Sequence, residues 1–136
     1  FLRTAHISGP IFNNYDIGGY LIFSLFPQEH VFVDNRPEAY PASFFQQVYI
    51  PMQESEEQWQ NVDRQYHFNS IVFSAADMTP WGQQFLITRI QDAQWIPVFA
   101  DASVIIFVRN TQHNTSIIAQ YAIPRNHFQI RPAIRP

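Results

Sequence analysis

Short apolar runs alternate with amphipathic stretches along most of the chain. The runs at residues 30–34 and 70–74 each end in a polar cluster, as expected of buried strands that open into loops. Two further runs, at residues 95–100 and 103–108, flank a two-residue connection and predict a tight antiparallel hairpin. Residues 8–12 predict a short strand that leads into the polar turn Asn13-Asn14.

Helix signals lie between these strands. Thr79-Pro80 supplies a cap and a proline for the first helical position, so a helix is predicted through Ile90. Ser55 and Gln58 form a capping-box pattern ahead of a helix that reaches Tyr66. Apolar spacing also predicts helices at residues 41–49, at residues 115–121 and from Asp16 onward, with a strand at residues 20–26 as the alternative to the last.

This order of elements predicts the fold class. Strands that alternate with helices through short connections are typical of a sheet covered by helices on both faces. We expect an α/β fold, a three-layer α/β/α sandwich with a mostly parallel sheet and an antiparallel C-terminal hairpin. Residues 1–122 are expected to form one domain, and residues 123–136, with three prolines and three arginines, an extended tail.

Composition fits a folded domain and excludes several chemistries. Of the 136 residues 46% are hydrophobic and 14% charged, and no apolar run reaches the roughly 18–20 residues that cross a bilayer. The absence of cysteine excludes disulfides and thiolate chemistry. The chain begins at Phe1 rather than at methionine, so we expect further sequence upstream.

The charged residues narrow the classes of partner. All eight basic residues are arginines, which excludes a Schiff-base lysine and a P-loop lysine. Three arginines and no acid lie in residues 123–136, so the rest of the chain has five arginines against eleven acids, a formal charge of −6. An acidic body argues against a nucleic-acid partner.

The densest polar cluster follows the predicted strand at residues 30–34. It consists of alternate residues on a loop stiffened by proline: Asp34, Arg36, Glu38 and Tyr40. Ligand sites of open α/β sheets lie at the carboxyl ends of strands, so the two acids could hold a divalent cation and the arginine a phosphate. The favoured interpretation is that Arg36 pairs with a neighbouring acid and pins the loop.

A second polar cluster follows the first predicted strand: Asn14, Asp16, Gly18 and Gly19. Glycines at a strand-to-helix turn can let backbone amides approach an anion. The G-x-G-x-x-G order of nucleotide folds is absent, so we favour a tight turn with close helix packing. The histidines are scattered and no G-x-S-x-G turn occurs, so we expect neither a metal nor another cofactor.

The first 40 residues contain a longer pattern. A stretch F-N-x-Y-x-x-G-G-Y-L from Phe12 to Leu21 precedes an apolar run that ends F-x-D-x-R-x-E-x-Y, from Phe32 to Tyr40. In both parts and their order, residues 9–40 resemble the C-terminal soluble domain of bacterial multi-pass membrane proteins related to the GT-C class of glycosyltransferases. One departure is Ile17, where that group often has tryptophan.

The resemblance implies a function and a location. In such proteins the catalytic acid and the lipid-phosphate site lie in the membrane-embedded part, so this chain is expected to be a non-catalytic accessory domain outside the cytoplasm. Its expected partners are the membrane-embedded part of the same polypeptide and a glycan or lipid-linked sugar. The alternative is a stand-alone phosphate- or nucleotide-binding enzyme that uses Asp34, Arg36 and Glu38. A third interpretation is a protein-interaction module that uses the arginine tail.

Overall fold

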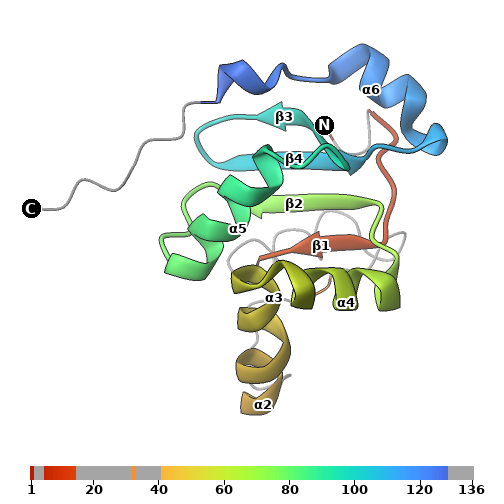
Figure 1. Cartoon of the computed structure of the whole chain (residues 1–136). Helices are drawn as coiled ribbons and strands as arrows, with labels where there is room; N and C mark the ends of the chain where they lie inside the picture. Colours follow the sequence, from red (N-terminus) through yellow and green to blue (C-terminus); the bar gives the residue numbers. More distant parts are fainter. Residues whose placement is uncertain (2–4, 15–31, 33–40, 129–136) are drawn as a thin grey trace, which may run out of the picture.

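The computed structural model describes residue 1, residues 5–14, residue 32 and residues 41–128, and they form a mixed α/β fold. The strands are β1 (Ile11–Asn13), β2 (Ser70–Ser74), β3 (Trp95–Ala100) and β4 (Val104–Arg109). The α-helices are α2 (Ala42–Phe44), α3 (Ile50–Glu54), α4 (Glu56–Tyr66), α5 (Pro80–Ile90) and α6 (Thr115–Tyr121). A π-helical segment, η2 (Phe45–Tyr49), joins α2 to α3, and two short 3₁₀ turns are η3 (Gln112–Asn114) and η4 (Arg125–His127) (Figure 1).

The strands lie in the order β1-β2-β4-β3. β1 pairs with β2 in parallel, whereas the pairs β2 with β4 and β4 with β3 are antiparallel. The expectation of a mostly parallel sheet is therefore wrong for the described strands, although the predicted hairpin is confirmed. The hairpin strands account for this strand order. Pro97 of β3 has no N–H to donate to a second neighbouring strand, so β3 is suited to the edge of the sheet. The pairing of β3 with β4 is irregular between Pro97 and Phe99.

The strand β4 is suited to the interior because both of its faces are apolar. Ile105 and Phe107 face one cluster of buried side chains, and Ile106 and Val108 face another. Such two-sided burial is typical of a central strand. β4 consequently lies between β2 and β3 instead of extending the sheet outward.

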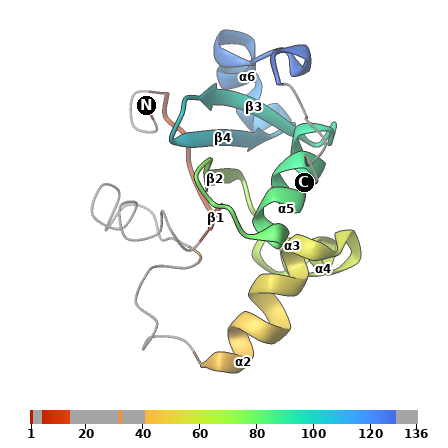
Figure 2. The ribbon, with the colours of Figure 1, turned by 90° about the vertical axis from the view of Figure 1, so that its left-hand side faces the viewer.

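The first apolar cluster lies under α3, α4 and α5, which lie together in Figures 1 and 2. Its centre is aromatic: the Phe12 ring of β1 lies 5.3 Å from the Trp59 ring and 5.1 Å from the Phe85 ring, measured between centroids. Trp59 in turn stacks on Phe68 at 5.6 Å. This cluster fixes the three helices to one face of the sheet.

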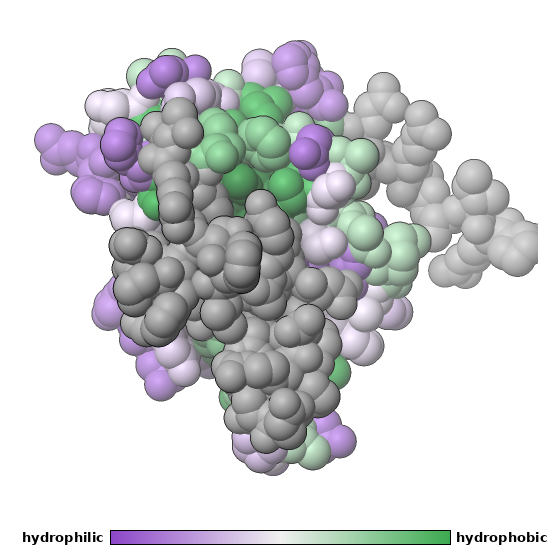
Figure 3. Space-filling model, turned by 180° about the vertical axis from the view of Figure 1, so that it is seen from behind, coloured by the Kyte–Doolittle hydropathy of each residue, from purple (hydrophilic) through white to green (hydrophobic). Residues whose placement is uncertain are grey.

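The second apolar cluster lies on the opposite face of the sheet. Buried Val72, Ile106 and Val108 contact Ala5 and Ile7 of the N-terminal segment and partly buried side chains of α6. In Figure 3, which shows the side turned away in Figure 1, apolar side chains gather in the upper half of the molecule. Helix α6 packs on β3. The described residues do not confirm that helices cover both faces of the sheet in the expected three-layer sandwich.

The predicted helix ends are found where local chemistry specifies them. The Thr79 hydroxyl accepts from the Gly82 N–H at 3.1 Å, and Pro80 is the first residue of α5. Ser55 precedes α4 and accepts from the Gln58 N–H at 3.4 Å. A strand is found near the one predicted at residues 8–12, but β1 begins three residues later, at Ile11, and includes Asn13, which was expected in the turn. The strand predicted at residues 30–34, with the helix expected from Asp16, lies outside the described residues except for Phe32.

Residues 123–128, at the start of the expected tail, contact the domain. The Ile123 N–H donates to the Pro97 carbonyl at 2.8 Å, and Phe128 packs against the first apolar cluster. The Arg125 guanidinium donates to three carbonyl oxygens, those of Ile90 (3.0 Å), Asp92 (3.0 Å) and Trp95 (3.3 Å). These bonds satisfy acceptors at the end of α5 and the start of β3.

Replacing Arg125 with methionine is expected to lower the free energy of unfolding by about 1–3 kcal/mol, because partly buried carbonyls lose a charged donor. Chemical denaturation followed by circular dichroism measures the change. The matched control is Arg64→Met, an exposed arginine that bonds within its own helix to Asn61, for which a change within about 0.5 kcal/mol is expected. Equal effects of the two substitutions would contradict the capping role of Arg125.

Candidate functional site

The structure places one of the eight sequence-predicted site residues, Asn14. The other seven lie outside the described residues: Asp16, Gly18, Gly19, Asp34, Arg36, Glu38 and Tyr40. Whether they pair with one another or hold a ligand therefore stays a prediction. Asn14 follows β1, at the edge of the sheet where the parallel strands β1 and β2 both have their carboxyl ends.

Asn14 is fully buried and joins the ends of two strands. Its side-chain carbonyl accepts from the Ser74 N–H at 2.9 Å, and its amide donates to Oδ2 of Asp77 at 2.9 Å. Ser74 is the last residue of β2, and Asp77 lies in the connection to α5. A single side chain thus links β1 to the end of β2 and to the loop that follows.

Both carboxylate oxygens of Asp77 accept hydrogen bonds in this arrangement. Its Oδ1 accepts from the Thr79 N–H at 2.9 Å and from the Thr79 hydroxyl at 2.6 Å, while Oδ2 accepts from Asn14. Thr79 in turn caps α5 through Gly82. A Cβ atom at Gly82 would lie 2.8 Å from Cγ of Asp77, so the helix approaches this carboxylate as closely as glycine allows. We name these four residues, Asn14, Asp77, Thr79 and Gly82, the strand-end cluster.

The neighbouring Asn13 joins the two parts of the sequence pattern that spans residues 12–40. Its side-chain carbonyl accepts from the Phe32 N–H at 2.8 Å, and its amide donates to the Asn14 carbonyl at 3.0 Å. The rings of Phe12 and Phe32 lie 5.4 Å apart. The first part of the pattern therefore holds a residue of the second by both a hydrogen bond and an aromatic contact.

An open hollow of about 460 Å³ lies at the other end of β2. One of its two arginines, Arg109, already has partners. Its Nε donates to the Phe68 carbonyl at 2.7 Å, Nη2 pairs with Asp63, and the guanidinium lies 4.5 Å from the Trp95 ring centroid. Arg109 thus holds together the end of α4, the start of β2 and the hairpin. The complete lining is Gln60, Asp63, Arg64, His67, Phe68, Asn69 and Arg109.

Sequence reasoning missed the roles of Asp77 and Arg109. A signal for Asp77 was present, because Asp77-x-Thr79-Pro80 places a carboxylate beside a capping threonine directly after a buried strand. Arg109 gave no such signal, because the predicted hairpin strand at residues 103–108 ends before it, whereas the structure sets Arg109 opposite Trp95. The signal for Asp77 does not indicate a ligand, which fits the structural contacts that this residue makes.

Within the described part of the chain, no group of three or more histidine, aspartate or glutamate side chains is arranged to hold a metal ion. No helix among the same residues has the length and apolar character needed to cross a membrane. Comparison of the chain with protein-family models, with curated proteins and with solved structures gives no match.

Proposed function

We propose that this chain is a non-catalytic accessory domain of a larger bacterial membrane protein of the glycosyltransferase-like kind, placed on the extracytoplasmic side. The observation that carries the proposal is the strand-end cluster. Ligand sites of α/β folds lie at the carboxyl ends of strands, and here the polar groups at that position bond to one another. The cluster thus suits a role in holding the fold.

The sequence pattern at residues 12–40 supports the proposal independently. Its resemblance to soluble domains of multi-pass membrane proteins implies that the chemistry takes place in the membrane-embedded part of the same polypeptide. The accessory domain would then contact the acceptor glycan or a lipid-linked sugar, or stabilise the membrane part. In the same proposal the architecture is a three-layer sandwich, since apolar clusters occur on both faces of the sheet.

The coding sequence upstream of Phe1 tests this proposal. It is expected to encode several apolar spans of about 20 residues each, in one reading frame with this domain. A short upstream reading frame without such spans would contradict the proposal.

The alternative, a phosphate- or nucleotide-binding enzyme that uses Asp34, Arg36 and Glu38, has no observation among the described residues in its favour. Calorimetric titration of the chain with a sugar nucleotide and Mg²⁺ separates the two functions. If the chain is an accessory domain, we expect no heat of binding for the sugar nucleotide. Binding that disappears in the Arg36→Gln variant, and persists in an Arg64→Gln control, would favour the enzyme.

A further inference from the structure

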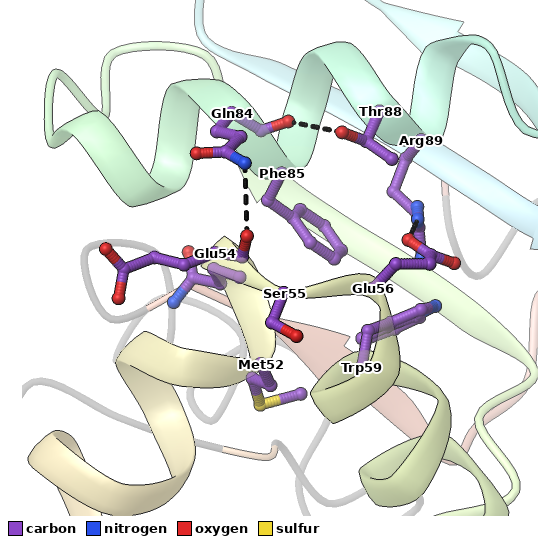
Figure 4. Close-up of a pocket in the computed structure, with 10 residues that line it drawn as sticks. Met52, Glu54, Ser55, Glu56, Trp59, Gln84, Phe85, Thr88 and Arg89 are labelled. Carbon is purple, nitrogen blue, oxygen red and sulfur yellow. Dashed lines mark hydrogen bonds and ion pairs between the residues drawn. The ribbon is translucent and has the colours of Figure 1, made fainter.

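The cavity at the junction of α3, α4 and α5 is bridged by contacts of its own lining (Figure 4). Gln84 donates to the Glu54 carbonyl at 3.1 Å, and Arg89 pairs with Glu56. Figure 4 shows these two contacts on opposite sides of Phe85. This cavity of about 100 Å³ leaves little room for a ligand. The open hollow of about 460 Å³ at the start of β2 falls within the range of about 300–1,000 Å³ that is usual for small-molecule sites.

Arg109 presents a free donor to this open hollow. Its guanidinium is held by Phe68, Asp63 and the Trp95 ring, and these contacts use Nε and Nη2. Nη1 has no hydrogen-bond partner among the described residues, and it is accessible to solvent in a side chain that is 24% exposed. The donor is therefore fixed in position before any ligand arrives, which lowers the entropic cost of binding.

Asp63 presents a free acceptor next to that donor. Its Oδ1 accepts from the Phe68 N–H at 3.2 Å and from Nη2 of Arg109. Within the described part of the chain Oδ2 has no partner, and it too is accessible to solvent, in a side chain that is 10% exposed. Because Nη2 and Oδ1 join the two groups, the free Nη1 and the free Oδ2 are neighbours in the lining.

This pair of atoms selects the chemistry of a ligand. A carboxylate or phosphate would accept from Nη1 of Arg109 but would be repelled by the charge of Asp63. An ammonium group would donate to Asp63 but would be repelled by Arg109 and by Arg64, which also lines the hollow. Two neighbouring hydroxyls can accept from Nη1 and donate to Oδ2 without a net charge.

His67 adds an unusual feature to the same lining. It ends α4 in the left-handed conformation, with φ 53° and ψ 55°, a position where glycine is the usual residue. Its exposed ring has no hydrogen-bond partner among the described residues and lines the hollow. A bulky residue kept in a strained backbone conformation is typical of functional sites. The neutral imidazole has one donor and one acceptor, which also suits hydroxyl groups.

We propose that this hollow binds one neutral sugar residue of a glycan. Two neighbouring hydroxyls are held by Nη1 of Arg109 and Oδ2 of Asp63, and the His67 ring makes a further hydrogen bond to the sugar. The site supplies the glycan contact of the accessory role proposed above, and in this sense it rests on that function. At so open a site the dissociation constant is expected to be about millimolar, too weak to give heat in the calorimetric titration with a sugar nucleotide.

Nuclear magnetic resonance titrations of the complete chain test the proposal. The probes are the methyl glycosides of glucose, mannose and galactose, which differ in the orientation of neighbouring hydroxyls. The Nε–H resonance of Arg109 reports on the hollow, with that of Arg125 as the internal reference. We expect a saturable shift of the Arg109 resonance with at least one glycoside. The uronic acid and the amino sugar of the hexose that binds best are expected to bind about threefold or more weakly, because each brings a charge.

Two results would overturn this assignment. One is the absence of a saturable shift with all three glycosides, and the other is tighter binding of the uronic acid, which would make the hollow an anion site. Both results are distinguishable from failure of the accessory role, which the coding sequence upstream of Phe1 tests separately. Apolar spans upstream with no sugar binding would refute the hollow alone, and sugar binding without such spans would refute the accessory role alone.

A variant tests the contact assigned to His67. His67→Gly removes the ring and relieves the left-handed backbone, so the denaturation midpoint is expected to stay the same or rise, while affinity for the best glycoside falls about threefold or more. The matched control is His6→Gly, because His6 also has a positive φ, 57°, but does not line the hollow. It is expected to bind like the unaltered chain. Unchanged affinity in His67→Gly would contradict the proposal.

Discussion

Replacing Phe12 with alanine is expected to lower the free energy of unfolding by about 3–5 kcal/mol, the largest effect that we predict. Phe12 is fully buried at the centre of the first apolar cluster. Among the described residues, its ring lies 5.1–6.5 Å, between centroids, from the rings of Phe32, Trp59, Phe68, Phe73 and Phe85. Truncation would leave a cavity between β1, α4 and α5 that the surrounding rings fill only in part.

Denaturant unfolding of the purified chain measures this loss. Met78→Ala serves as the control, because Met78 is 80% exposed and its truncation is expected to change the free energy of unfolding by no more than about 0.5 kcal/mol. A loss below about 1 kcal/mol for Phe12→Ala would show that the aromatic contacts of β1 do not determine stability.

The second large effect is expected for Asp77→Asn, a loss of about 1–3 kcal/mol in the free energy of unfolding. The carboxylate accepts three hydrogen bonds, two from Thr79 and one from Asn14. An asparagine offers one oxygen and one NH₂ group, so whichever way it is oriented, one donor faces another donor. Asn14 cannot relieve this by turning its amide, because its own oxygen accepts from Ser74.

Thermal and chemical unfolding of Asp77→Asn measure that loss. Glu54→Gln removes the same kind of charge at an exposed position and is expected to stay within about 0.5 kcal/mol. If Asp77→Asn were as stable as the parent chain and altered the binding of a small molecule instead, the cluster would be a ligand site.

The elements that the sequence predicts correctly are those that local chemistry specifies. Thr79-Pro80 begins α5 because a hydroxyl cap and a proline act within one turn. The hairpin of β3 and β4 forms because two apolar runs are joined by a short connection. Such signals need no knowledge of the rest of the chain.

The pairing of strands distant in sequence was not predicted, because it depends on contacts between separate elements. Placing β4 beside β2 requires weighing Pro97 at the edge against the two apolar faces of β4. The link between Asn14 and Asp77 joins residues 63 positions apart. The contact between Trp59 and Arg89 likewise forms only when α4 and α5 meet, so it cannot be recognised from either helix alone.

The strand-end cluster is best tested by a double-mutant cycle between Asn14 and Asp77. The free energies of unfolding of Asn14→Ala, Asp77→Ala and the double variant give the coupling between the two side chains. If they stabilise the fold through each other, both single variants lose stability and the coupling is about 1 kcal/mol or more. Single effects that add to within about 0.3 kcal/mol would contradict this account, because the two side chains would then act independently.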